Sequence, residues 1–169
     1  HDHAEGNPHY WGDPENIKHM AENILAALIK ARPEREKLFQ SNFRVFVEEL
    51  DQLVVELQSQ VAQLKNKRVV SYSAAFPYFF QRFGIDNHAT VETTCEQEVS
   101  PQRVAQVISL MKQEKINVII GEEVLPRLPE GIARETGAQV VLLWPATVPS
   151  GDYMATLREN INRLTAVLE

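Results

Sequence analysis

Residues 67–72, Lys67-Arg68-Val69-Val70-Ser71-Tyr72, decide the fold class, because a short apolar run of this kind is typical of a buried strand. Strands and helices alternate from here to the end of the chain. Further strands are expected near 87–92, 116–120 and 139–143, and helices over about 74–83, from Pro101, ahead of Gly137 and around 154–168. Such alternation gives a parallel sheet that is covered on both faces. The sequence therefore predicts an α/β lobe over residues 67–169.

Two helices are predicted before this lobe. The first should run from about Pro14 to Ala31 and end at Arg32-Pro33, because the residue before a proline avoids the helical region. A longer helix is expected over 33–64, where apolar residues recur at helical spacing: Phe39, Phe43, Phe46, Leu50, Leu53, Leu57, Val61 and Leu64. A helix of this length spans about 45 Å, so it should bridge two bodies or lie along the back of one.

An exposed histidine is expected on a stiff loop in the stretch NPHYWGDPEN, residues 7–16. Asp13 is a candidate N-cap for the following helix, and Pro14 suits its first position because the missing N–H costs nothing there. His9 is therefore held beside a helix start, where it can present an imidazole to a metal ion. The alternative is a loop histidine that only packs beside Tyr10 and Trp11.

The composition excludes several classes of function. The chain has 169 residues, 44% of them hydrophobic, and a net charge of −6, which argues against a nucleic-acid partner. No phosphate-binding glycine motif, G-x-S-x-G, C-x-x-C or H-E-x-x-H occurs, so no enzyme class is supported. No run approaches the ~18 apolar residues of a membrane span. The single cysteine, Cys95, allows no internal disulfide, and the abrupt start at His1-Asp2-His3 suggests that the sequence begins inside a longer protein.

Several motifs, taken together, resemble one protein family. They are residues 7–16, the long helix, residues 69–84, Ser100-Pro101, the VIIGE stretch at 118–122 and TGA at 136–138. In this order the chain resembles the solute-binding proteins of metal-ion ABC transporters of the zinc and manganese type. That resemblance implies two α/β lobes joined by a backbone helix, with a metal ion between the lobes. It identifies 1–32 as a remnant of the N-terminal lobe, 33–66 as the connecting helix and 67–169 as the C-terminal lobe.

The resemblance also implies which positions should hold metal ligands. His9 matches the second histidine of the N-terminal lobe, Ser73 stands where the family has a histidine or glutamate, and Trp144 stands where it has an aspartate. A serine hydroxyl is a poor zinc ligand, and an indole N–H is only a donor. The usual site is therefore expected to be incomplete and to bind zinc or manganese weakly or not at all.

Four residues add further candidate contacts around this site. Glu122 matches an acidic family residue near the cleft and follows a buried strand, so lining a pocket and starting a helix are both open roles. Trp144 can either plug the space left by a missing ligand or stack on a different one. His1 and His3 look like the end of a His-rich loop and can chelate a metal weakly, although a solvated tail is the favoured interpretation.

Two hypotheses of function follow. The first is a non-enzymatic component of a metal-cation ABC transporter, with zinc uptake favoured, which delivers its ion to a membrane permease from the periplasm or cell surface. The second is a degenerate lobe that binds no metal and instead binds a partner protein or a second copy through the apolar seam of the long helix.

Overall fold

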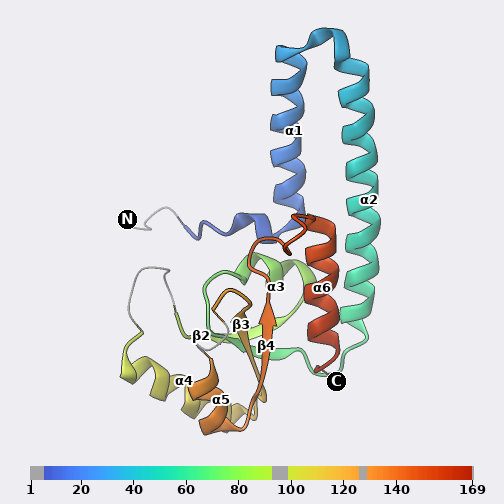
Figure 1. Ribbon diagram of the computed structural model, residues 1–169. Coiled ribbons are helices and arrows are strands. Elements are labelled where there is room, and N and C mark those ends of the chain that lie inside the picture. Colours follow the sequence, from blue (N-terminus) through green and yellow to red (C-terminus); the bar gives the residue numbers. More distant parts are fainter. Residues whose placement is uncertain (1–5, 93–98, 126–128, 169) are drawn as a thin grey trace.

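The computed structural model describes residues 6–92, 99–125 and 129–168, and Figure 1 shows how they are arranged. A helical hairpin extends from one end of an α/β lobe that is built around a four-stranded sheet. The strands are β1 (Arg68–Ser71), β2 (Asp86–Thr90), β3 (Val118–Glu122) and β4 (Gln139–Leu143). They lie in the order β2-β1-β3-β4, and each pair is parallel, which confirms the predicted sheet.

Alternate residues of the strands enter two separate cores on opposite faces of the sheet. In β1, Val69 packs into the first core and Val70 into the second, and in β3, Val118 and Ile119 divide in the same way. This alternation is required of strands that are buried on both faces. The first core is covered by α2 (Glu36–Ala62), α3 (Pro77–Phe83) and α6 (Tyr153–Thr165), and the second by α4 (Pro101–Glu114) and α5 (Glu130–Thr136).

The hairpin consists of α1 (Pro14–Ala31), a 3-10 turn η2 (Pro33–Arg35) and α2. Helix α1 has the predicted bounds, whereas α2 begins at Glu36 because the residues before it form the 3-10 turn. The second half of α2 is buried against the lobe through Leu50, Leu53, Leu57 and Val61. The hairpin is therefore attached to the lobe at its base.

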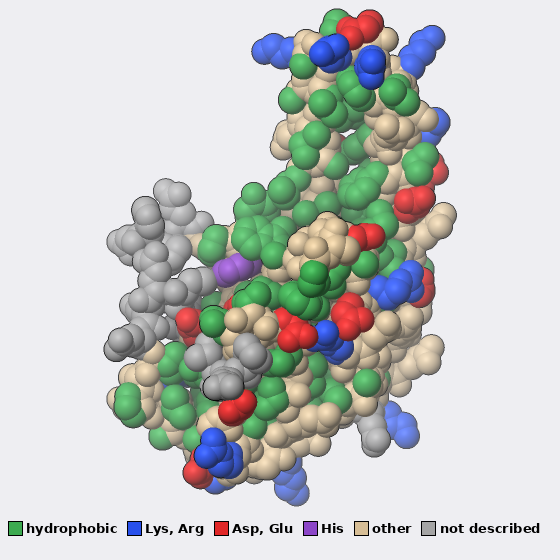
Figure 2. All heavy atoms as spheres, viewed as in Figure 1, with side chains coloured by type: hydrophobic (Ala, Val, Ile, Leu, Met, Phe, Trp, Pro, Cys, Tyr) green, Lys and Arg blue, Asp and Glu red, His purple; other side chains and the backbone are tan. Residues whose placement is uncertain are grey.

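The outer half of the hairpin has an apolar groove between its two helices. Figure 2 shows hydrophobic side chains gathered along this face, and the groove has a volume of about 310 Å³. Its lining consists of Ala21, Ile24, Leu25, Leu28, Phe39, Asn42, Phe43 and Phe46. The three phenylalanines of the predicted seam therefore line a groove, and of these only Phe46 also packs against the first core.

Two elements of the lobe begin later than predicted. A turn occupies the residues after β1, where Ser71 Oγ donates to the carbonyl of Ser73 at 2.7 Å and Ser73 Oγ accepts from the Ala75 amide at 3.1 Å. Serine bonds of this kind compete with helical bonds, so α3 starts only at Pro77. Strand β3 starts at Val118 because the Ile116 amide still bonds the carbonyl of Met111 at the end of α4.

None of the helices in the described parts of the chain is long and apolar enough to cross a membrane.

Candidate functional site

The carboxyl ends of the strands bring together the residues that the sequence analysis selected. Ser73 follows β1, Glu122 ends β3, and Trp144 follows β4 directly. Glu92 follows β2, and its amide donates to the carbonyl of Tyr72 at 2.8 Å. Parallel strands present these ends at one edge of the sheet, where α/β proteins bind their ligands.

Ser73 and Glu122 form a hydrogen-bonded pair at the centre of this edge. Ser73 is buried, and its hydroxyl donates to Glu122 Oε1 in a very short hydrogen bond. The same hydroxyl oxygen accepts from the Ala75 amide, so the turn fixes its direction. Glu122 therefore lines the edge as a side-chain partner of Ser73, and α5 begins well after it at Glu130.

Glu92 adds a second carboxylate that sequence reasoning missed. Burial raises the pKa of Glu92, and the charge of Glu122 raises it further. Burial also raises the pKa of the Tyr72 hydroxyl, with an added contribution from the charge of Glu92. The edge is thus acidic, with two carboxylates close enough to influence each other. The fold topology brings Glu92 and Glu122 together, and no sequence motif around Glu92 indicates this.

The His9 loop is fastened to the same edge. Asn7 Nδ2 donates to the carbonyl of Ala74 at 2.7 Å, and this bond sets the orientation of the Asn7 amide. Asn7 Oδ1 then accepts from the amide and from Nδ1 of His9, both at 2.9 Å. In the neutral ring, Nδ1 carries the hydrogen and Nε2 carries the lone pair that binds metals. The ring also makes an edge contact with Trp11, with centroids 5.3 Å apart, which is the contact that the packing alternative expects.

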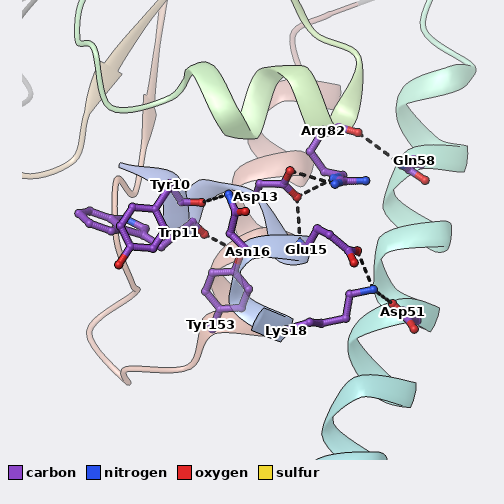
Figure 3. A network of polar contacts seen from close by, with 10 residues as sticks. All are labelled: Tyr10, Trp11, Asp13, Glu15, Asn16, Lys18, Asp51, Gln58, Arg82 and Tyr153. Atoms are coloured by element: carbon purple, nitrogen blue, oxygen red, sulfur yellow. Dashed lines mark hydrogen bonds and ion pairs between the residues drawn. The ribbon is translucent and has the colours of Figure 1, made fainter. Parts of the chain in front are cut away.

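Two aromatic residues attach the middle of the loop to the lobe. Trp11 Nε1 donates to the carbonyl of Pro145 at 2.9 Å, and the hydroxyl of Tyr153 donates to the carbonyl of Trp11 at 2.8 Å. Burial raises the pKa of Tyr153, so the phenol stays protonated and remains a donor. At the end of the loop, Asp13 pairs with Arg82 of α3, as Figure 3 shows.

Trp144 is held mainly by helix α6. Asn160 Oδ1 accepts from the Trp144 amide at 2.9 Å, and Asn160 Nδ2 donates to the Trp144 carbonyl at 3.0 Å. The guanidinium of Arg163 lies 6.0 Å from the centroid of the indole ring. Glu123 and Glu159 hold this guanidinium at 2.7 Å and 2.8 Å. The position that the resemblance gives to an aspartate thus carries a half-buried indole beside a cation.

The described residues contain no group of three or more His, Cys, Asp or Glu side chains placed to hold a metal ion. His1, His3 and Cys95 lie outside the described residues. His9, Glu122 and Glu92 therefore do not form such a group in this structure, and Ser73 and Trp144 contribute only a hydroxyl and an indole.

Comparisons with known proteins show which proteins the chain resembles. Over 172 residues the chain is 28% identical to the zinc-binding protein AdcA of Streptococcus pyogenes, covering 97% of the chain and 33% of AdcA. Over 143 residues it is 27% identical to the high-affinity zinc uptake system protein ZnuA of Brucella abortus, covering 84% of the chain and 43% of ZnuA. The chain thus spans between a third and a half of these curated relatives.

A solved structure confirms the fold. The laminin-binding protein Lbp of Streptococcus pyogenes matches with a TM-score of 0.84 and 29% identity, covering 99% of this chain and 68% of that one. The long helix followed by an α/β lobe is therefore the architecture of this relative as well. A protein-family model described as zinc-uptake complex component A, periplasmic, matches residues 1–167, so the chain belongs to that family.

Proposed function

We propose that this chain is part of a metal-ion solute-binding protein that carries zinc, or manganese as the other candidate cargo, to an ABC permease. Segments 1–32, 33–66 and 67–169 are then the remnant of an N-terminal lobe, the connecting helix and the C-terminal lobe. The family match over residues 1–167 supports this proposal. The observation that carries it is the bond from Asn7 to the carbonyl of Ala74, because it seats the His9 loop on the ligand-binding edge of the sheet.

The site offers this cargo only part of a coordination shell. His9 supplies an imidazole, and Glu122 supplies a carboxylate that is already engaged by the Ser73 hydroxyl. Zinc normally takes three or four N, S or O ligands, and neither a serine hydroxyl nor an indole is a good substitute. We therefore expect this chain to bind zinc more weakly than about 1 μM.

Restoring the two expected ligands tests this proposal. Calorimetric titration of the double variant Ser73→His/Trp144→Asp should show zinc binding at least about tenfold tighter than the unchanged chain, a gain of about 1.4 kcal/mol. The matched control is Ser73→Ala/Trp144→Phe, which alters the same positions without adding a ligand. His9→Ala should cancel the gain. A sub-micromolar affinity of the unchanged chain that Ser73→Ala abolishes would contradict the proposal of an incomplete site.

The remaining functional expectations follow from the same proposal. The chain acts as a binding protein and not as an enzyme, and its net charge of −6 does not favour a nucleic-acid partner. Its place is the periplasm or the cell surface, which agrees with the description of the family as periplasmic.

A second candidate function is self-association through the hairpin. The groove between α1 and α2 is apolar, and Ile24 and Leu28 on its α1 side are 58% and 41% exposed. A second copy of this chain that lays its own hairpin on this face would bury both side chains. This function does not require the metal site.

A further inference from the structure

Arg82 connects the end of the His9 loop to the lobe. Its Nε lies 2.6 Å from Asp13 Oδ1, and its terminal nitrogen lies 2.9 Å from Asp13 Oδ2. The two side chains are only 30% and 20% exposed. Two parallel bonds of this kind fix the direction of a carboxylate as well as its distance, which a single ion pair cannot do.

The same carboxylate also begins helix α1. Asp13 Oδ1 accepts from the amide of Glu15 at 2.9 Å, so Asp13 is the N-cap of α1. Arg82 therefore orients a residue that is at once the end of the His9 loop and the start of the hairpin. Any rotation of Asp13 moves both.

Arg82 contacts the second arm of the hairpin through its backbone. Its carbonyl accepts from Gln58 Nε2 of α2 at 3.0 Å, as Figure 3 shows. One residue in the last turn of α3 thus bonds the start of α1 and the C-terminal part of α2. Arg158 also makes a two-bond pair, with Glu56, but that pair is 48% and 46% exposed and joins only α6 to α2.

We propose that Arg82 is a positioning residue, which holds the His9 loop and the hairpin in register with the carboxyl edge of the sheet. Asn7 fastens the start of the loop, Trp11 and Tyr153 fasten its middle, and the Asp13–Arg82 pair fixes its far end. Without the guanidinium, the segment beyond Trp11 can pivot about the remaining bonds. The relevance of this positioning to metal capture rests on the proposed function, whereas the positioning of the loop by Arg82 does not depend on it.

Hydrogen exchange of backbone amides tests this role. In Arg82→Gln, exchange at the amides of Gly12, Asp13 and Glu15 should be at least about tenfold faster, a local loss of about 1.4 kcal/mol, while exchange in β1 and β3 stays unchanged. Arg82→Lys should give an intermediate rate, because lysine keeps the charge and loses the two-bond geometry. The matched control is Arg158→Gln, which should leave all three amides unchanged.

A merely stabilising ion pair would behave differently. It would raise exchange by the same factor in the loop and in the sheet, and that outcome, or no change at all, overturns the proposal. If Arg82→Gln does not fold, Arg82→Lys is compared with Arg158→Lys instead. The proposal then requires faster amide exchange in the loop, but not in the sheet, for Arg82→Lys alone.

A second variant pair separates positioning from capping. Asp13→Asn keeps a good N-cap but loses the charged partner, so it should reproduce the local exchange of Arg82→Gln. The double variant Asp13→Asn/Arg82→Gln should be no faster than either single variant, because both remove the same contact. If the increase in exchange rate in the double variant equalled the product of the two single-variant increases, the proposal would be overturned. If Ser73→His/Trp144→Asp gains no zinc affinity, the proposed function fails, while the exchange results still decide the role of Arg82.

Discussion

At the scale of single residues, the carboxyl edge of the sheet combines one imidazole with two carboxylates. Glu92 and Glu122 come from different strands, and each is only partly buried. The hydroxyl of Ser73 donates a hydrogen bond to Glu122, whereas burial and the charge of Glu122 both disfavour ionisation of Glu92. A cation at this edge would relieve that repulsion, which supports a cation as the cargo.

This repulsion predicts a pH dependence of stability. Burial and the charge of Glu122 raise the pKa of Glu92 in the folded protein, so the folded state holds this proton more tightly than the unfolded chain. The free energy of unfolding should therefore fall as the pH rises from below the ordinary pKa of a glutamate through the raised one. Glu92→Gln should remove the part of this decrease in the free energy of unfolding that is due to Glu92. The variant should therefore be more stable than the unchanged chain at about pH 7 but not at about pH 4.

Urea denaturation at several pH values measures this difference. The control is Glu135→Gln, at an exposed position of α5, which should leave the pH profile parallel to that of the unchanged chain. If the pH profile of Glu92→Gln were also parallel to that of the unchanged chain, ionisation of Glu92 would not destabilise the folded protein.

At the scale of elements, strand β3 has a glycine, Gly121, where its neighbours leave no room for a side chain. A Cβ added to Gly121 would lie 2.8 Å from Pro129 Cγ and 2.9 Å from Leu142 Cδ2. Gly121→Ala should therefore destabilise the protein by about 1–3 kcal/mol through overpacking. It would also disturb the strand end that carries Glu122.

A second glycine provides the matched control. Gly131 lies in α5, and a Cβ added there would meet no atom within 4 Å. Gly131→Ala should stabilise the protein by about 0.5–1 kcal/mol, because alanine loses less backbone entropy in a helix. Equal midpoints of urea denaturation for the two variants would refute the close approach at β3.

The elements also show what the sequence could predict. Helix α1 was predicted at both ends because Asp13-Pro14 and Arg32-Pro33 mark its bounds locally. The start of α3 was predicted too early, because the serine turn after β1 depends on hydrogen bonds that no periodicity reveals. The Asp13–Arg82 pair spans 69 positions of sequence, so it required the fold to be known. For the same reason the sequence identified Glu122 at the site but not its neighbour Glu92.

At the scale of the whole molecule, the described chain is a lobe with a hairpin that presents apolar side chains on one face. If that face is an interface between two copies, sedimentation velocity should show a larger species whose fraction grows with concentration. The double variant Ile24→Asp/Leu28→Asp should remain monomeric, because each charge would have to be buried in the dimer. The control is Val124→Asp, a residue that is 59% exposed in the lobe and lies outside the groove.

A chain that sediments as a monomer at every concentration would contradict self-association and leave the metal-ion proposal untouched. The two functions are therefore separable by experiment, since one depends on the sheet edge and the other on the outer half of the hairpin.

The attachment of the hairpin at its base has a mechanical consequence. Helix α1 contains 18 residues and so extends about 27 Å beyond its N-cap, Asp13. A tilt of about 5° at that pivot displaces the far end by about 2 Å, while atoms beside the pivot hardly move. Because the His9 loop lies beside this pivot, a small rearrangement of the loop around an ion at the sheet edge would cause a larger displacement at the far end of the hairpin.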